Sequence, residues 1–273
     1  MKQRVVIKLG GSSLQNESTM YELATAVRGF RDRGYDVVIV HGGGPAINAE
    51  LVRRGIEWKF INGQRQTTSL MMEVIEEVLG CDVNKRIVSG LRESDIPAVG
   101  LSGARDRILF CTQADPELMQ VGQVACVEAS AIEAVLKSPM RPVPVIAPIG
   151  FDGGDVIFNV NADWAATKIA VALNATKLVF LTDQSGILDH KKDLVKTATP
   201  VKIQKMIDTG VISGGMLTKV YAMMSALTHG VDQIRVMNAS YASHLFSRSR
   251  FGTLLRDDER RASVKEVAHV YAS

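Results

Sequence analysis

The chain has 273 residues, of which 46% are hydrophobic and 22% charged, and its formal net charge is +3. This composition is typical of a globular protein with a large core, and the small, scattered positive charge argues against nucleic-acid binding. No run of about 18 apolar residues predicts a membrane span, and the first residues lack the features of a secretory signal. The three cysteines form no C-x-x-C motif, which argues against a zinc site and favours reduced thiols in a cytoplasmic protein.

Short apolar runs that recur along the chain predict strands buried on both faces. They cover residues 4–9, 37–40, 98–101, 143–148, 178–181 and 233–237. Stretches with apolar residues at helical spacing predict helices between them, over residues 18–32, 68–93, 162–173, 202–209 and 216–228. This alternation predicts an α/β fold in which a mostly parallel sheet has helices on both faces.

Two segments depart from this alternation, and the tail is distinct. Residues 103–128 contain two strand-like runs, 107–112 and 121–127, and predict a projecting β-hairpin. Residues 150–158 predict a glycine-containing turn followed by a short strand. Residues 256–273 are polar and then amphipathic, which predicts a surface helix.

The first predicted strand runs directly into a glycine pair. Residues 4–13 read Arg-Val-Val-Ile-Lys-Leu-Gly-Gly-Ser-Ser, so Lys8 lies just before Gly10 and Gly11. A lysine in a buried strand is costly unless an anion pairs with it, and glycine lets backbone N–H groups approach that anion closely. We interpret these three residues as a phosphate-binding group; the alternative is an edge-strand lysine that reaches solvent.

A second glycine loop follows the second predicted strand. His41 precedes Gly42, Gly43 and Gly44, and Pro45 then starts a helix whose N-terminus favours anions. The loop matches neither the Walker A pattern nor G-x-G-x-x-G. Two anion-binding loops with a lysine between them suit phosphoryl transfer, which depends mainly on positioning and charge neutralisation. We interpret His41 as a packing residue rather than an acid–base catalyst.

Further polar residues follow predicted strands or begin predicted helices. Arg65, in the segment Asn-Gly-Gln-Arg, presents a planar fork suited to a carboxylate. Asn159, Asn161 and Asp163 exceed what a helix cap requires, and an aspartate here could orient lysines or hold a metal. Lys219 lies in the first turns of a helix after a glycine pair, an arrangement that attracts phosphate. The structural alternatives are a solvated arginine, helix capping and an exposed helix lysine.

The turn after the strand at 178–181 reads Thr-Asp-Gln-Ser-Gly. In an open α/β sheet, ligands bind at the carboxyl ends of the strands, so this turn is a candidate nucleotide-binding edge.

Six motifs, taken in order, resemble those of the amino acid kinase family: Lys-Leu-Gly-Gly, His-Gly-Gly-Gly-Pro, Asn-Gly-Gln-Arg, Asn-Val-Asn-Ala-Asp, Leu-Thr-Asp-Gln-Ser-Gly-Ile-Leu and Gly-Gly-Met-Leu-Thr-Lys. The resemblance covers residues 4–255 and is greatest to members that phosphorylate N-acetyl-L-glutamate in arginine biosynthesis. It implies a three-layer αβα sandwich, with an acyl-substrate lobe and dimer seam over residues 1–175 and a nucleotide lobe over residues 176–273. It also implies ATP with Mg²⁺, a homodimer and a cytoplasmic location.

The resemblance further implies roles for individual residues. Lys8 and Lys219 would stabilise the transferring phosphoryl group, and Asp163 would orient both lysines; no protein metal ligand is implied. The acyl substrate would be held by Gly43, Gly44, Arg65 and Asn159. ATP and its transferring phosphoryl group would be bordered by Gly10, Gly11, Asp183, Ser185, Gly186, Ile187, Leu188, Val211, Ile212 and Ser213.

The chemistry of such an acceptor agrees with these residue types. A γ-carboxylate has a reference pKa of about 4.3 and is already an anion near neutral pH. It needs no general base to attack phosphorus, so the site requires cations and N–H donors rather than a histidine.

Alternatives remain open. A relative acting on N-acetyl-α-aminoadipate, or on its carrier-linked form, would bind a substrate longer by one methylene, which a pocket discriminates by only about 1–3 kcal/mol. A non-catalytic amino-acid or nucleotide sensor could retain the fold, whereas a dinucleotide-binding oxidoreductase is disfavoured because G-x-G-x-x-G is missing.

The chain also departs from the family pattern. The departures are Ala104-Arg105-Asp106 and Met237-Asn238, and they bear mainly on the identity of the acyl substrate. The chain starts directly at the first predicted strand, without the extra N-terminal helix of hexameric, arginine-inhibited members. This predicts a homodimer without strong arginine feedback.

Overall fold

A large sheet forms the centre of the computed structural model, which describes residues 3–16, 18–247 and 251–257. Within these residues, eight strands pair in the order β12-β14-β13-β11-β1-β2-β8-β5. Neighbouring strands are parallel except β13 and β14, which are antiparallel. The strands are β1 (Arg4–Leu9), β2 (Asp36–His41), β5 (Ala98–Ser102), β8 (Val143–Ala147), β11 (Lys177–Thr182), β12 (Thr197–Ala198), β13 (Gln233–Asn238) and β14 (Thr253–Leu255). The predicted mostly parallel sheet is confirmed.

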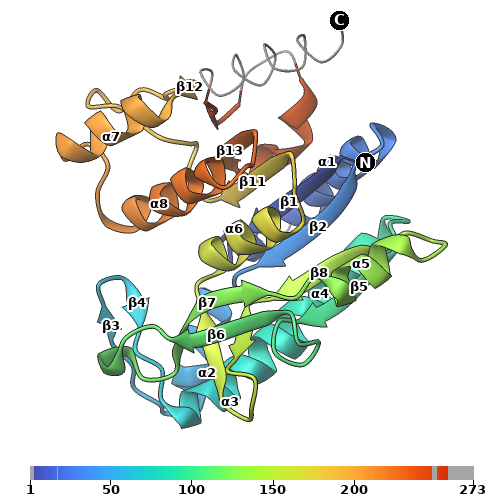
Figure 1. The fold of residues 1–273 in the computed structure, drawn as a ribbon, viewed down its shortest axis with the longest axis vertical. Helices are drawn as coiled ribbons and strands as arrows, with labels where there is room; N and C mark the ends of the chain where they lie inside the picture. The colour runs from blue at the N-terminus through green and yellow to red at the C-terminus, as the bar shows by residue number, and fades with distance from the viewer. Residues whose placement is uncertain (1–2, 17, 248–250, 258–273) are drawn as a thin grey trace, which may run out of the picture.

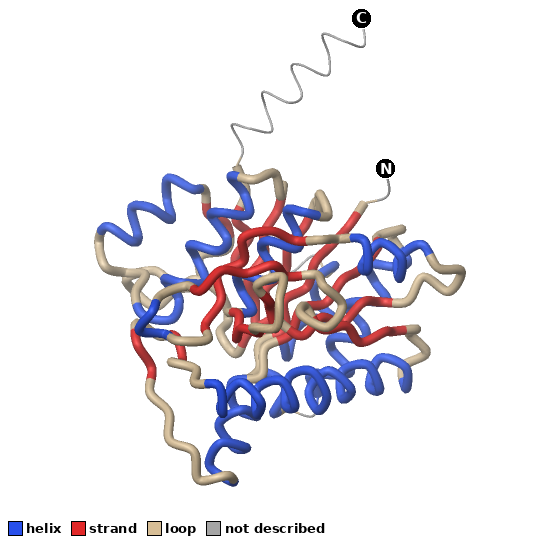
Figure 2. Tube along the Cα trace, turned by 60° about the horizontal axis from the view of Figure 1, so that its bottom comes forward, coloured by secondary structure: helices blue, strands red, loops and turns tan. Residues whose placement is uncertain are grey.

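Helices cover both faces of the sheet, as the two hydrophobic cores show. One core contains residues of α1 (Ser18–Asp32), α2 (Gly44–Arg53), α3 (Ser69–Glu77) and α4 (Asn84–Glu93). The other contains residues of α5 (Ser130–Lys137), α6 (Ala162–Ala172), α7 (Pro200–Asp208) and α8 (Gly214–Thr228). Figure 1 shows α6 and α8 side by side over one face, and Figure 2 shows helices on both sides of the strands. The result is the expected three-layer αβα sandwich.

The alternation of side chains along β1 determines which way Lys8 points. Successive residues of a strand face opposite sides of a sheet. Val5, Ile7 and Leu9 belong to the core under α1 to α4, whereas Val6 belongs to the core under α5 to α8. Lys8 is in phase with Val6, so it faces the layer that contains α6 and α8.

A small closed barrel lies beside the main sheet, built from β6 (Leu109–Gln113), β7 (Val121–Val127), β9 (Ile149–Phe151) and β10 (Ile157–Val160). The antiparallel pair β6–β7 confirms the predicted hairpin. A second hairpin, β3 (Phe60–Ile61) and β4 (Gln64–Arg65), lies next to the β6–β7 connection (Figure 1). The side chain of Gln66 joins the two by donating to the carbonyl oxygen of Glu117 at 2.7 Å.

The helix predicted over residues 68–93 is interrupted, which is a correction. Its two α-helical parts, α3 and α4, are separated by a π-helical segment, Val78–Val83. Helix α5 and strands β12 and β14 were not predicted, because elements this short show little periodicity. No helix in the described ranges is both long and apolar enough to cross a membrane. Residues 258–273, most of the predicted tail helix, lie outside the described residues.

Candidate active site

The two predicted glycine loops touch each other at the carboxyl ends of β1 and β2. The N–H of Gly10 donates to the carbonyl oxygen of Leu181 at 2.8 Å, which ties the first loop to β11. A Cβ on Gly11 would lie 2.7 Å from the backbone nitrogen of Gly43 and 2.9 Å from that of Gly44. No side chain fits between backbones this close, so glycine is required at position 11. The two loops therefore form one continuous surface of backbone, which is buried or half-buried.

Three charged side chains meet beside this surface. The ammonium nitrogen of Lys8 lies 2.8 Å from Oδ1 of Asp163, and that of Lys219 lies 2.7 Å from Oδ2 of the same carboxylate. All three side chains are nearly buried, with between 10% and 11% of their surface exposed. They come from β1, the first turn of α6 and the second turn of α8. Two ammonium groups and one carboxylate leave one net positive charge.

The pKa values of this cluster reflect burial and mutual charge. Burial alone would raise the pKa of Asp163, but the two ammonium groups have the larger combined effect and lower it to about 2. Burial lowers the pKa of Lys219 from its ordinary value, and the positive charge of Lys8 adds to that effect. Asp163 and Asp183 act in the opposite direction on Lys219. Asp163 is therefore ionised at any physiological pH.

Arg65, at the end of β4, is a buried cation that contacts α2. It is 7% exposed, and its Nη2 donates to the side-chain oxygen of Asn48 on α2. Its guanidinium carbon lies 5.0 Å from the ring centroid of Phe60 and 5.4 Å from that of Trp58. Its Nη1 is buried, and no described atom accepts a hydrogen bond from it. Burial lowers the pKa of Arg65. A guanidinium with an unused donor can receive a carboxylate oxygen.

The two asparagines before α6 have different roles. Asn161 is the N-cap of α6, because its Oδ1 accepts from the backbone N–H groups of Asp163 and Trp164. Asn159 is not a cap: its Nδ2 donates to the hydroxyl of Thr67 at 3.1 Å. Thr67 follows β4, so Asn159 joins the barrel to the segment that carries Arg65.

Asp183 lies at the carboxyl end of β11, close enough to Lys219 to affect its pKa. Its Oδ1 accepts from the hydroxyl of Thr182, and its carbonyl oxygen accepts from the side-chain amide of Asn238 at 2.9 Å. Asn238 thus positions the candidate nucleotide-binding turn. Sequence reasoning noted Asn238 only as a departure from the family pattern.

The other predicted nucleotide-binding residues differ in exposure. Ile187 and Ile212 are core residues, 1% and 4% exposed, so their side chains pack inward. Ser213 is exposed and is the N-cap residue of α8, although its side chain makes no capping hydrogen bond. Of the remaining predicted residues, three are at least partly exposed: Ser185, Leu188 and Val211. Gly186 is buried and has a φ of +145°.

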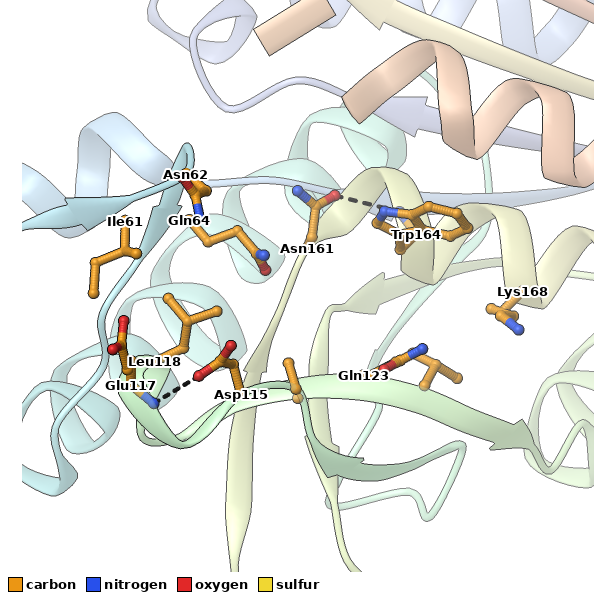
Figure 3. Close-up of a pocket in the computed structure, with 13 residues that line it drawn as sticks. Ile61, Asn62, Gln64, Asp115, Glu117, Leu118, Gln123, Asn161, Trp164 and Lys168 are labelled. Atoms are coloured by element: carbon orange, nitrogen blue, oxygen red, sulfur yellow. Dashed lines mark hydrogen bonds between the residues drawn. The ribbon is translucent and has the colours of Figure 1, made fainter. Parts of the chain in front are cut away.

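A cavity of about 390 Å³ lies between the β3–β4 hairpin and the first turns of α6 (Figure 3). Its walls come from the β3–β4 hairpin, from β7 and the turn before it, and from α6. Gln64, Asp115 and Lys168 are among its lining residues, together with Trp164 and the cap residue Asn161. In Figure 3 the amide nitrogen of Asn161 points toward Gln64 across the cavity. The lining thus combines polar and apolar groups, and along the chain it adjoins both Arg65 and Asp163.

His41 and Asn84 form a contact that the sequence did not indicate. His41 is fully buried, and burial lowers its pKa to about 4, which agrees with a packing role. Sequence reasoning also missed Asn48, which contacts Arg65, and Asn84, which contacts His41. The available signal was an amide side chain among the apolar positions of a predicted helix.

No group of three or more His, Cys, Asp or Glu side chains in the described ranges could hold a metal ion. Cys81, Cys111 and Cys126 are free thiols. Burial raises the pKa of Cys111 to about 12, so this thiol is not reactive.

Comparisons with known proteins agree with this geometry. The sequence model of the amino acid kinase family matches residues 3–238. A relative from Geobacillus kaustophilus named acetylglutamate kinase is 39% identical over 87% of this chain and 91% of its own length. Another of that name, from Cereibacter sphaeroides, is 36% identical over 94% of this chain and 89% of its own. The solved structure of smu.665 from Streptococcus mutans has a TM-score of 0.81 and 31% identity, and the match covers 94% of this chain and all of that one.

Proposed function

The chain belongs to the amino acid kinase family, and we propose that it is a carboxyl-group phosphotransferase acting on N-acetyl-L-glutamate. ATP phosphorylates the γ-carboxylate, and the products are N-acetyl-L-glutamyl 5-phosphate and ADP, as in arginine biosynthesis. The observation that carries the proposal is the Lys8–Asp163–Lys219 cluster beside the paired glycine loops. The relatives named acetylglutamate kinase support the choice of substrate.

In this reaction a γ-carboxylate oxygen of the substrate attacks the γ-phosphorus of ATP. The bond between that phosphorus and its bridging oxygen breaks, and ADP leaves with the bond's electron pair. Lys8 and Lys219 stabilise the charge that spreads over the transferring group, and the N–H of Gly11 binds its oxygens. Gly10, whose N–H is bonded to Leu181, leaves room for that group beside the loop. Asp163 keeps the two ammonium groups in place. No proton has to be removed from the acceptor.

For the acyl substrate, we propose that Arg65 binds the α-carboxylate. The buried Nη1 of Arg65, which has no described acceptor, supports this role. Gly43 and Gly44 offer backbone N–H groups at the start of α2. Asn159, held by Thr67 between the barrel and β4, completes the set.

ATP would lie along the carboxyl ends of β11 and β13, between the turn at residues 183–188 and the start of α8. Asp183, Ser185, Gly186 and Leu188 would contact it from the turn, and Val211 and Ser213 from the segment before α8. Ile187 and Ile212 would support this edge from within, since their side chains are buried and their N–H groups are bonded to Thr253 and Met206. Mg²⁺ would be held mainly by the phosphates and water, because Asp163 is engaged by two lysines.

Trapping the acyl phosphate with hydroxylamine tests this function. The purified chain with ATP and Mg²⁺ should give hydroxamate with N-acetyl-L-glutamate and little with aspartate, glutamate or UMP. Absence of hydroxamate with every carboxylate, from folded protein that binds ATP, would contradict the proposal and favour a sensor.

The same assay should include other acyl substrates, because of the cavity between the β3–β4 hairpin and α6. Its volume of about 390 Å³ exceeds that of an acetyl group, and its lining includes polar side chains such as Gln64, Asp115 and Lys168. This favours including N-acetyl-α-aminoadipate and glutamate with longer, polar N-acyl groups. A higher kcat/KM for one of these would move the assignment toward the aminoadipate or carrier-linked reaction.

We also propose a homodimer, with α3, the π-helical segment and α4 at the seam. Leu70 on α3 is 56% exposed, which supports an apolar contact there. The lobes would meet within one sheet, because β1 pairs with both β2 and β11. A cytoplasmic location fits the three free thiols. Light scattering tests the dimer: a hexameric or monomeric mass would contradict it.

A further inference from the structure

Asn84 connects the second glycine loop to the helices behind it. It is the first residue of α4 and is 4% exposed. Its Nδ2 lies 3.2 Å from Nε2 of His41 and 2.9 Å from the carbonyl oxygen of Val145. Its Oδ1 occupies the position that a Cβ on Gly100 would take. One buried amide therefore contacts β2 at its last residue and β8 and β5 at their middle residues.

His41 carries this contact into the loop. Because Asn84 donates to Nε2, the hydrogen of the neutral ring lies on Nδ1, which donates to the carbonyl oxygen of Gly42 at 3.2 Å. The N–H of Gly42 donates to the carbonyl oxygen of Leu9 at 2.8 Å. The peptide groups on both sides of Gly42 are thus held, one by His41 and the other by β1.

The π-helical segment directs two side chains at the loop. In an α-helix, residues five apart lie about 140° apart around the axis. In a π-helical turn, with its i to i+5 hydrogen bonds, they lie near the same face. Leu79 and Asn84 are five apart across Val78–Val83. A methyl group of Leu79 fills the position that a Cβ on Gly43 would take, while Asn84 binds His41.

We propose that Asn84 is a positioning residue for the acyl substrate: through His41 it holds Gly42, and together with Leu79 it fixes the N–H groups of Gly43 and Gly44. The π-helical segment is the feature that makes both contacts possible. This proposal rests on the proposed function for the identity of the substrate. The contacts of Asn84 lead directly to the loop of the acyl substrate, and only Gly11 among the predicted ATP residues adjoins that loop. Loss of Asn84 should therefore weaken binding of the acyl substrate much more than binding of ATP.

The variant Asn84→Asp tests this proposal, because it keeps the shape of the side chain and removes its donors. We expect the KM for N-acetyl-L-glutamate to rise at least tenfold, while the KM for ATP changes by less than twofold. Val88→Ala is the matched control, since Val88 is buried on the same helix one turn later. It should destabilise the fold without changing either KM.

Amide hydrogen exchange of residues 42–47 gives a readout that does not depend on activity. We expect at least tenfold faster exchange in Asn84→Asp than in Val88→Ala. The two variants would overturn the proposal if they had the same exchange rates and the same KM values. If Asn84→Asp does not fold, Leu79→Ala replaces it, with the same expectations for exchange and KM. Failure of the proposed function is separate, because it would appear as an inactive wild-type protein with the exchange difference intact.

Discussion

Lys219 donates to Oδ2 of Asp163 over 2.7 Å, although 56 residues separate the two along the chain. The contact exists because α6 and α8 pack side by side on one face of the sheet (Figure 1). Lys8 reaches the other oxygen from β1, directly beneath α6. One carboxylate thus holds two cations that would otherwise repel each other, at the place where the proposed reaction develops negative charge.

Replacing Asp163 by asparagine should lower kcat by about 10²–10³-fold, because a neutral amide cannot hold both ammonium groups in place. Hydroxamate formation at saturating substrate measures the effect. Asp193→Asn, which changes an exposed carboxylate, is the control and should stay within twofold of wild type. A wild-type kcat in Asp163→Asn would show that the lysines do not need this carboxylate.

The pH dependence of kcat should report Lys219. Because burial lowers its pKa below the ordinary value of 10.5, its ammonium group loses its proton at a lower pH than an exposed lysine does. Activity should therefore fall on the alkaline side before pH reaches about 10.5. Lys219→Arg should be slower but should keep its charge, so its alkaline decline should begin at higher pH. If wild type and Lys219→Arg lost activity over the same alkaline pH range, the decline would belong to a group other than Lys219.

Arg65→Lys should raise the KM for N-acetyl-L-glutamate by about 10–100-fold and leave the KM for ATP nearly unchanged. Lysine lacks the planar fork that can bind Asn48 and a carboxylate together. Steady-state kinetics in which each substrate is varied in turn gives the two KM values separately. Arg53→Lys serves as the control, since the side chain of Arg53 is 68% exposed on α2. Equal changes in both KM values would count against a carboxylate at Arg65.

Gly11→Ala should destabilise the protein by about 1–3 kcal/mol, because the added Cβ would meet backbone atoms of the second loop that cannot move aside. Urea unfolding measures the free energy of unfolding. Gly215→Ala on α8 is the control: a Cβ there meets nothing within 4 Å, so stability should stay equal or increase by up to about 1 kcal/mol. Wild-type stability in Gly11→Ala would mean that the two loops can separate.

Local patterns in the sequence predicted much of the fold. The bounds of β1 and α1 agree with the structure to the residue, and the β6–β7 hairpin and both glycine loops were located correctly. These features depend on the apolar period of a strand or helix and on the backbone freedom of glycine, which act over a few neighbouring residues. The sequence motifs also named Lys8, Asp163 and Lys219, and through their resemblance to the family they assigned Asp163 the task of orienting both lysines.

Other features arise only when distant segments pack. The π-helical segment could not be predicted, because it depends on how Leu79 and Asn84 fit against the second glycine loop. The low pKa of His41 results from complete burial, and the unused donor of Arg65 results from burial of its side chain against Asn48 of α2. The sequence by itself therefore determined which residues and loops this protein has for binding anions. Only the tertiary structure decided their distances and charges, because burial and long-range contacts depend on every element packed around them.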